Sequence, residues 1–198
     1  MGGTRQVFVG FFLLTILASG CKHKPVLSRA PFSDEQLNVY RGLLDMLSVL
    51  HSKNLSTVSE PFDFTGFPET RPCLNGIELE HVSEAQRIIH TFGPEITQGR
   101  DLKLVDRHEQ TKLLKQRDAS PIVPNEKLTE ESQQNGSELN FLALSEIAFD
   151  KKHQFAVVKY VLRCGEHCGS GATLVMERVD ARWIASSGRP ACALLIGY

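Results

Sequence analysis

The sequence has no run of basic residues and no long hydrophobic segment, and both absences limit the classes of function. Its 22 Lys and Arg residues are balanced by 23 Asp and Glu residues, for a formal net charge of −1. Binding to nucleic acid normally requires a basic patch, so nucleic acid is disfavoured as a partner. The longest apolar run, residues 7–17, has about eleven residues, whereas a membrane-spanning helix needs about 20.

Motifs of several enzyme classes are also missing. The patterns G-x-S-x-G and H-E-x-x-H do not occur, and no Gly-rich phosphate loop follows a predicted strand. No spacing pairs a serine with His81, His90 or His108 as nucleophile and base, so we interpret these histidines as surface or hydrogen-bonded residues on helices. The sequence therefore identifies no catalytic residue and no cofactor.

The first 20 residues have the features of a signal peptide. Arg5 precedes the apolar run, and small residues at positions 18–20 lead to Cys21. The sequence L-A-S-G-C resembles the bacterial lipobox, in which the Cys after the cleavage site receives a diacylglycerol. We therefore expect a lipoprotein signal peptide over residues 1–20 and a lasting lipid anchor on Cys21. The alternative is an ordinary secretory signal followed by an unmodified cysteine.

Residues 21–32 contain Lys, Pro, Ser and Arg without hydrophobic periodicity, which is typical of a flexible tether. The remaining chain, 33–198, is long and apolar enough for one domain with a sizeable core. Ser33 and Gln36 form a capping-box pattern that predicts a helix from Ser33 to about residue 51. An apolar stripe on this helix is expected to face the core, and it contains Leu37, Tyr40, Leu44 and Leu47.

Two further helices are predicted in the N-terminal half. A short one covers residues 83–92, between Ser83 and a Gly-Pro stop, and a longer one begins near Asp106 and ends near residue 117. Residues 55–58 are compatible with a short strand, and Phe62 belongs to a group of aromatic residues that we expect to pack in the core. The polar segment 118–138 is predicted to be a loop.

The strongest pattern in the chain lies at residues 142–185 and predicts a β-meander. Apolar runs at 142–149, 155–162, 172–179 and 182–185 are separated by turn residues, among them the pair Asp180-Ala181. The apolar residues 190–198 indicate a terminal strand, because leaving them in water is unfavourable. We therefore predict an α+β fold in which N-terminal helices pack on a C-terminal antiparallel β-meander.

Lipidation of Cys21 would leave four cysteines, Cys73, Cys164, Cys168 and Cys192. An even number in an oxidising compartment predicts two disulfides, and three pairings are open. Glycines at 165, 169 and 171 can supply the positive φ values of a tight reversal, across which Cα atoms lie about 4.5–5.5 Å apart. We therefore prefer pairing Cys164 with Cys168 and Cys73 with Cys192.

The same reversal offers two other kinds of chemistry. Cys164, His167 and Cys168 are residue types that bind zinc, with His153 or Cys192 as a fourth ligand, but three ligands so close in a tight turn rarely reach one ion. Thiol redox catalysis is disfavoured because nothing indicates a helix N-terminus that would lower a thiol pKa. We therefore identify no metal-binding residues.

The patterns L-S-x-I-x-F-D, A-V-V-x-Y and C-G-x-x-C-G-x-G, followed by a strand, a turn and a Trp, resemble an uncharacterised family of bacterial secreted proteins and lipoproteins. The segment P-I-x-x-N-x-x-L at 121–128 also fits, so the resemblance covers about residues 102–184. His167 departs from the family's pattern, which has an apolar residue there. The resemblance implies fold and secretion, and it brings no activity, cofactor or catalytic residue.

These observations predict a noncatalytic module of the bacterial cell envelope, anchored to a membrane through Cys21, that binds a protein or a small-molecule ligand. The alternative is an envelope enzyme, hydrolytic or thiol-redox, with an active site that the sequence does not identify. A deep polar pocket that holds a His or carboxylate pair would favour the enzyme. A flat apolar patch or an exposed sheet edge would favour the binding module.

Overall fold

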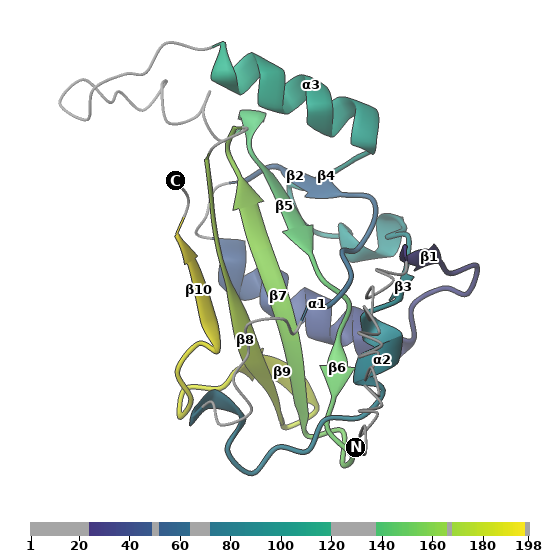
Figure 1. The fold of residues 1–198 in the computed structure, drawn as a ribbon, viewed down its shortest axis with the longest axis vertical. Coiled ribbons are helices and arrows are strands. Elements are labelled where there is room, and N and C mark those ends of the chain that lie inside the picture. The colour runs from purple at the N-terminus through teal and green to yellow at the C-terminus, as the bar shows by residue number, and fades with distance from the viewer. Residues whose placement is uncertain (1–23, 49–51, 64–71, 120–137, 166–167, 197–198) are drawn as a thin grey trace, which may run out of the picture.

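The computed structural model describes residues 24–48, 52–63, 72–119, 138–165 and 168–196 (Figure 1). A mixed, mostly antiparallel sheet forms its centre, and a long helix lies across one face of this sheet. The helical segments are α1 (Asp34–Leu47), α2 (Val82–Ala85) and α3 (Arg107–Asp118), with 3-10 turns at Pro72–Leu74 and Pro94–Ile96. The strands are β1 (Val26–Leu27), β2 (Asn54–Ser56), β3 (Ile88–Ile89), β4 (Lys103–Val105), β5 (Phe141–Leu144), β6 (Ala148–Phe149), β7 (Phe155–Arg163), β8 (Gly169–Val179), β9 (Arg182–Ala185) and β10 (Ala193–Ile196).

The predicted meander is confirmed. β7 pairs antiparallel with β5, β6 and β8, and β8 pairs antiparallel with β9. The turn between β8 and β9 consists of Asp180 and Ala181, whose φ angles of 47° and 63° are those of the primed turns that suit the right-handed strand twist. The predicted terminal strand is also confirmed, because β10 pairs antiparallel with β8 along the far edge of the sheet.

The N-terminal half differs from the prediction because it contributes strands as well as helix. β2 pairs in parallel with both β4 and β5, which extends the meander into an eight-stranded sheet. The expectation of several N-terminal helices packed on the sheet is not supported: α1 packs there, whereas α2 is a single turn of four residues. The helix predicted at 83–92 ends at Ala85 as α2, because the β-branched residues Ile88 and Ile89 pair with the distant β1 and form β3.

The boundary between tether and domain also changes. Val26 and Leu27 pair in parallel with Ile88 and Ile89, so the expected tether is bound to the domain from Val26 onward. The signal peptide and Cys21 lie outside the described residues. No helix in the described part of the chain is both long and apolar enough to cross a membrane.

Helix α1 begins and packs as the sequence predicts. The Ser33 hydroxyl accepts a hydrogen bond from the Gln36 amide at 3.2 Å, and the Gln36 side chain accepts one from the Ser33 amide at 2.9 Å. Burial of each large apolar side chain stabilises the fold by about 1.5–3 kcal/mol. The stripe packs against Trp183, Met176 and Val158 of the sheet, and it contains Leu37, Tyr40, Leu43, Leu44 and Leu47.

β5 and the central parts of β7 and β8 are buried on both faces, whereas Ile184 of β9 is 48% exposed. Val157 and Val175 point away from α1 and belong to a second apolar cluster with Phe62, Cys73 and Cys192. The Cys73–Cys192 disulfide is confirmed, with 5.3 Å between the two Cα atoms. It joins the Pro72–Leu74 turn to the segment that leads into β10, so two parts of the chain far apart in sequence cover the second face.

The reversal between β7 and β8 contains the second predicted disulfide. Cys164 and Cys168 have Cα atoms 5.0 Å apart, inside the expected range. Gly165 has the predicted positive φ, at 148°, but Gly169 and Gly171 do not, because both lie in β8. Gly171 is required by close approach instead, since a Cβ there would lie 2.1 Å from the Tyr160 carbonyl oxygen of β7.

Helix α3 begins where the sequence predicts. The Asp106 carboxylate caps it by accepting a hydrogen bond from the Glu109 amide at 2.9 Å. The apolar side of α3 packs over the end of the sheet formed by β4 and β5 (Figure 1). That small cluster is separate from the α1 core, and it contains Val105, Leu113, Phe141 and Ala143.

Candidate functional site

A cavity of about 250 Å³ lies where the start of α1 meets α2, β3 and β6. We call it the His90–Glu146 cavity, after the buried pair described below. The described residues that line it include four Glu and three His but no Lys or Arg. The lining consists of Ser33, Glu35, Gln36, Glu80, His81, Glu84, Ala85, Ile88, His90, Glu146, Ile147, Phe149 and His153.

Glu146 reaches the cavity because the strand is interrupted between β5 and β6. The chain leaves regular pairing at residues 145–147, and the Glu146 amide donates to the Glu60 carbonyl at 2.7 Å. Tyr40 supports the interruption from α1 through a 2.8 Å hydrogen bond from its hydroxyl to the Ser145 carbonyl. Burial and the charge of Glu146 raise the pKa of Tyr40 well above its usual range, so the phenol stays a donor.

The Glu146 carboxylate is almost completely buried, with 3% of its side chain exposed. Its Oε1 atom accepts hydrogen bonds from the His90 amide at 2.9 Å, from His90 Nδ1 at 3.0 Å and from the Ser59 hydroxyl. No described residue donates a hydrogen bond to Oε2. A carboxylate has lone pairs on both oxygens, so Glu146 retains acceptor capacity on an atom that the protein leaves without a partner.

His90 is oriented by the same contacts. Because a carboxylate oxygen only accepts, Nδ1 is the donor in the contact with Glu146, and in the neutral ring Nε2 is then an acceptor. The imidazole packs at 4.7 Å between ring centroids on Phe32, and 14% of the side chain is exposed. Nε2 makes no hydrogen bond to a described residue, so the ring presents a second acceptor without a partner.

More exposed ion pairs form the mouth of the cavity. Glu35 lies 2.7 Å from His153 and 3.6 Å from Arg178, and His81 lies 3.7 Å from Glu84. Such exposed pairs contribute little to stability, about 0–1 kcal/mol each. Their carboxylates nevertheless add to the negative charge around the buried Glu146.

The residues predicted from sequence lie elsewhere. Both disulfides are confirmed, and none of their cysteines lines the His90–Glu146 cavity. With Cys164 and Cys168 joined to each other, the alternative zinc site there has no free thiol, and His167 lies outside the described residues. Within the part of the chain that the structure describes, no group of three or more His, Cys, Asp or Glu residues could hold a metal ion.

Sequence reasoning missed the pair His90 and Glu146 at the base of the cavity and the Ser59 that contacts both. His90 was interpreted as a satisfied helix residue, whereas it follows β3 and pairs with Glu146. One signal was present: Glu146 is an acidic residue inside the apolar run of residues 141–149, where a charge is costly unless it has partners. No local signal identifies Ser59, because its contacts with His90 and Glu146 span 31 and 87 residues.

The pair can bind hydrogen-bond donors, and it has part of what general-base catalysis requires. A carboxylate that orients the Nδ1–H of an imidazole leaves Nε2 ready to take a proton. The Ser59 hydroxyl, however, is hydrogen-bonded to Glu146 and not to the imidazole, so Ser59 and His90 do not form a nucleophile–base pair.

Comparison with known proteins does not show which family this chain belongs to. No protein-family model matches the chain, and no curated protein or solved structure matches it. The resemblance to a family of bacterial secreted proteins therefore stays a prediction, and any functional conclusion depends on the site itself.

Proposed function

We propose that this chain is an exported protein, held on a bacterial membrane by lipid on Cys21, whose domain binds a small ligand in the His90–Glu146 cavity without transforming it. One observation carries the binding function. Two acceptors, Glu146 Oε2 and His90 Nε2, belong to largely buried side chains that line the cavity, and no hydrogen bond joins either atom to a described residue. Both atoms can accept a hydrogen bond, and a ligand in the cavity would supply the donors.

The alternative function is an envelope hydrolase in which His90 acts as a general base on water. The carboxylate-bound imidazole beside a cavity favours this alternative. A polar pocket that holds such a pair is the feature that we expected to favour an enzyme over a binding module. A serine nucleophile is disfavoured because the Ser59 hydroxyl is held by Glu146, and binding is supported by the open acceptors on Glu146 and His90. A metal-activated water is not favoured either, since no group of metal-binding side chains occurs among the described residues.

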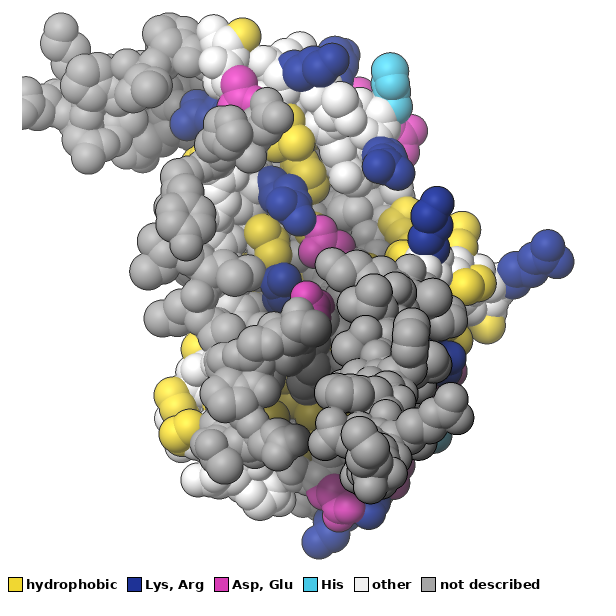
Figure 2. All heavy atoms as spheres, in the orientation of Figure 1, with side chains coloured by type: hydrophobic (Ala, Val, Ile, Leu, Met, Phe, Trp, Pro, Cys, Tyr) yellow, Lys and Arg dark blue, Asp and Glu magenta, His cyan; other side chains and the backbone are white. Residues whose placement is uncertain are grey.

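The first described segment supports the membrane anchor. Val26 and Leu27 are 64% and 54% exposed, and Lys24 and Arg29 on either side are also exposed. At the β1 edge, hydrophobic and basic side chains lie next to each other (Figure 2). Apolar side chains beside basic ones favour contact with a membrane interface, and this segment follows Cys21 by only a few residues.

Replacing Cys21 with Ala is expected to abolish the lipid anchor. Cells that express the full chain with labelled palmitate should yield labelled wild-type protein in the membrane fraction, whereas the Cys21→Ala variant should be unlabelled. Because each buried methylene contributes about 0.8 kcal/mol, several acyl chains hold the wild type on the membrane. The Cys164→Ala/Cys168→Ala double variant is the control and should keep the label. An unlabelled wild type released after cleavage would show an ordinary secretory signal and refute the anchor.

Binding in the cavity can be tested with a mixture of amine, alcohol and carboxylate fragments. Ligand-observed NMR on the mature, detergent-solubilised protein should detect at least one fragment class. His90→Ala should weaken the hits about tenfold or more, because each lost hydrogen bond with a charged group contributes about 1.5–3 kcal/mol. His108→Ala, an exposed histidine on α3 that does not line the cavity, should leave binding unchanged.

The same samples separate binding from catalysis. Mass spectrometry after long incubation should recover every bound fragment unchanged. Consumption of a fragment by wild type but not by His90→Ala would contradict the noncatalytic proposal and establish the hydrolase. Hits that bind His90→Ala as tightly as wild type would place the ligand elsewhere on the molecule.

A further inference from the structure

We infer that the ligand of the His90–Glu146 cavity carries an aliphatic primary ammonium group, which donates a hydrogen bond to Glu146 Oε2. This inference depends on the proposed binding function and specifies the chemistry of its ligand. The argument has three parts: the hydrogen-bonding roles of the two atoms, the charge of the lining and the apolar walls.

The two unpartnered atoms are both acceptors. Glu146 Oε2 belongs to a carboxylate, and His90 Nε2 is the acceptor of a ring whose Nδ1 donates to Glu146 Oε1. An ammonium group has three donors and no acceptor, so it can donate to either of these atoms. An alcohol has a single donor, and a carboxylate or phosphate ligand has none to offer when ionised.

The charge of the cavity lining also favours a cationic ligand. The Glu146 side chain is 3% exposed, and its hydrogen-bond partners are the Ser59 hydroxyl and the amide and Nδ1 of His90. A buried carboxylate without a cation is costly, and a ligand cation would offset that cost. Glu80 and Glu84 add negative charge, Glu35 is paired with Arg178, and no described Lys or Arg lines the cavity. A cleft lined by charge of one sign concentrates ligands of the opposite sign.

The walls and the mouth define the remainder of the ligand. Ala85, Ile88 and Ile147 line the cavity with apolar surface, which suits a short methylene chain. The carboxylates become more exposed from the base outward, because the Glu84 side chain is 60% exposed and that of Glu146 only 3%. A ligand with a second ammonium group at the other end of its chain would meet the Glu84 carboxylate at the mouth. We therefore expect an aliphatic diamine to bind more tightly than a monoamine.

Isothermal titration of the mature protein with four probes of similar size tests the inference. 1,4-Diaminobutane should bind most tightly and 1-aminobutane less tightly, whereas 1-butanol and butanoate should not bind measurably. Glu146→Gln should weaken both amines about tenfold or more, because it removes the charge but keeps a side chain of the same shape. Glu84→Gln should weaken the diamine alone, about threefold, as expected for an exposed pair.

A matched control variant and an NMR measurement on wild-type protein exclude misfolding as the cause of weaker binding. Glu78→Gln changes an exposed carboxylate that pairs with Lys151 and does not line the cavity, so amine binding should be unchanged. In wild-type protein, the ¹⁵N NMR signal of His90 Nε2 should shift when 1-aminobutane is added. That second result does not require any variant to fold.

The outcomes distinguish this inference from the function on which it depends. If butanol or butanoate binds as tightly as the amines, or if Glu146→Gln binds amines like wild type, the ammonium inference is overturned while binding in the cavity stands. If the amine is bound but consumed, the noncatalytic function is overturned while ammonium recognition stands. If the His90 signal does not move and no probe binds, the ammonium inference is refuted, and the fragment screen decides the function.

Discussion

Replacing Cys73 and Cys192 together with Ala is expected to lower the free energy of unfolding by about 4–5 kcal/mol. The disulfide connects residues 119 positions apart in the chain. In the chain-entropy account, closing so long a loop restricts the unfolded state strongly, and a loop of about 100 residues contributes about 4.7 kcal/mol. Small domains have about 5–15 kcal/mol in total, so the variant would lose a large share of its stability.

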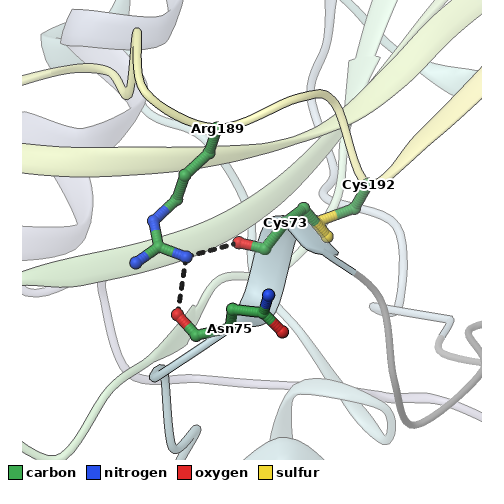
Figure 3. Close-up of a disulfide and its surroundings, with 4 residues drawn as sticks. All are labelled: Cys73, Asn75, Arg189 and Cys192. Atoms are coloured by element: carbon green, nitrogen blue, oxygen red, sulfur yellow. Dashed lines mark hydrogen bonds between the residues drawn. A yellow bond between two sulfur atoms is a disulfide. The ribbon is translucent and has the colours of Figure 1, made fainter.

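The contacts around the Cys73–Cys192 disulfide show which part of the fold it holds in place. Cys73 and Cys192 are 1% and 5% exposed and belong to the cluster that covers the second face of the sheet. Arg189 donates hydrogen bonds to the carbonyls of Cys73 at 3.0 Å and Asn75 at 2.8 Å (Figure 3). The bond therefore holds the Pro72–Leu74 turn against the segment before β10, and without it this cover depends on Arg189 and on apolar contacts.

Urea unfolding followed by circular dichroism measures the change, and the other disulfide is the matched control. Cys164→Ala/Cys168→Ala removes a bond between residues four positions apart, for which the same account gives about 2 kcal/mol. The longer bond should therefore account for at least twice the loss of the shorter one. An equal loss in the two variants, or a larger one for the hairpin bond, would refute the entropic explanation.

Replacing Gly42 with Ala is expected to lower the free energy of unfolding by about 3 kcal/mol, which is the upper part of the range for overpacked cores. Gly42 lies in α1 where the helix crosses β9, and a Cβ there would lie 2.0 Å from the Trp183 carbonyl oxygen. That atom belongs to backbone, so it cannot rotate away as a flexible side chain would. The helix would have to move off the sheet, and Leu43 and Trp183 would lose part of their packing.

The sign of the change in unfolding free energy distinguishes a steric contact with β9 from an effect of helix propensity. At an exposed helix position, Gly to Ala normally stabilises by about 0.5–1 kcal/mol. A destabilised Gly42→Ala variant in urea unfolding therefore reports the contact with β9 and not helix propensity. Gly188→Ala is the control, because a Cβ at Gly188 has nothing within 4 Å and its φ is not positive; its stability should change little. A Gly42→Ala variant more stable than wild type would show that α1 and β9 are farther apart than described.

The elements with strong local signals were predicted well. The capping box of Ser33 and Gln36 starts α1, because both partners lie within one helical turn. The antiparallel strands β7, β8 and β9 follow one another with short turns, so alternation and turn residues were sufficient to locate them. The pairing of Cys164 with Cys168 had a geometric reason in the same hairpin, and Cys73 with Cys192 followed once that pair was preferred.

The errors occurred where pairing depends on distant segments. β4 has three residues beside a charged helix, and it is a strand because β2 pairs with it in parallel across about fifty intervening residues. Ile88 and Ile89 fit a helical pattern until β1 is available to pair with them. The second face of β7 and β8 is buried only because the disulfide-linked segments cover it. None of these partners can be identified from local periodicity.

By itself, the sequence determined the start of α1, the meander and the set of cysteines available for disulfides, because each depends on residues close together in the chain. It also predicts export and a lipid on Cys21. The tertiary structure alone decided the parallel additions to the sheet and the His90–Glu146 cavity. Ser59, His90 and Glu146 are separated by 31 and 56 residues, and they meet only because β3 and the interruption between β5 and β6 pack against residues 58–60. A site made by such long-range packing leaves no periodic pattern in the sequence, and its single trace is an acidic residue within an apolar run.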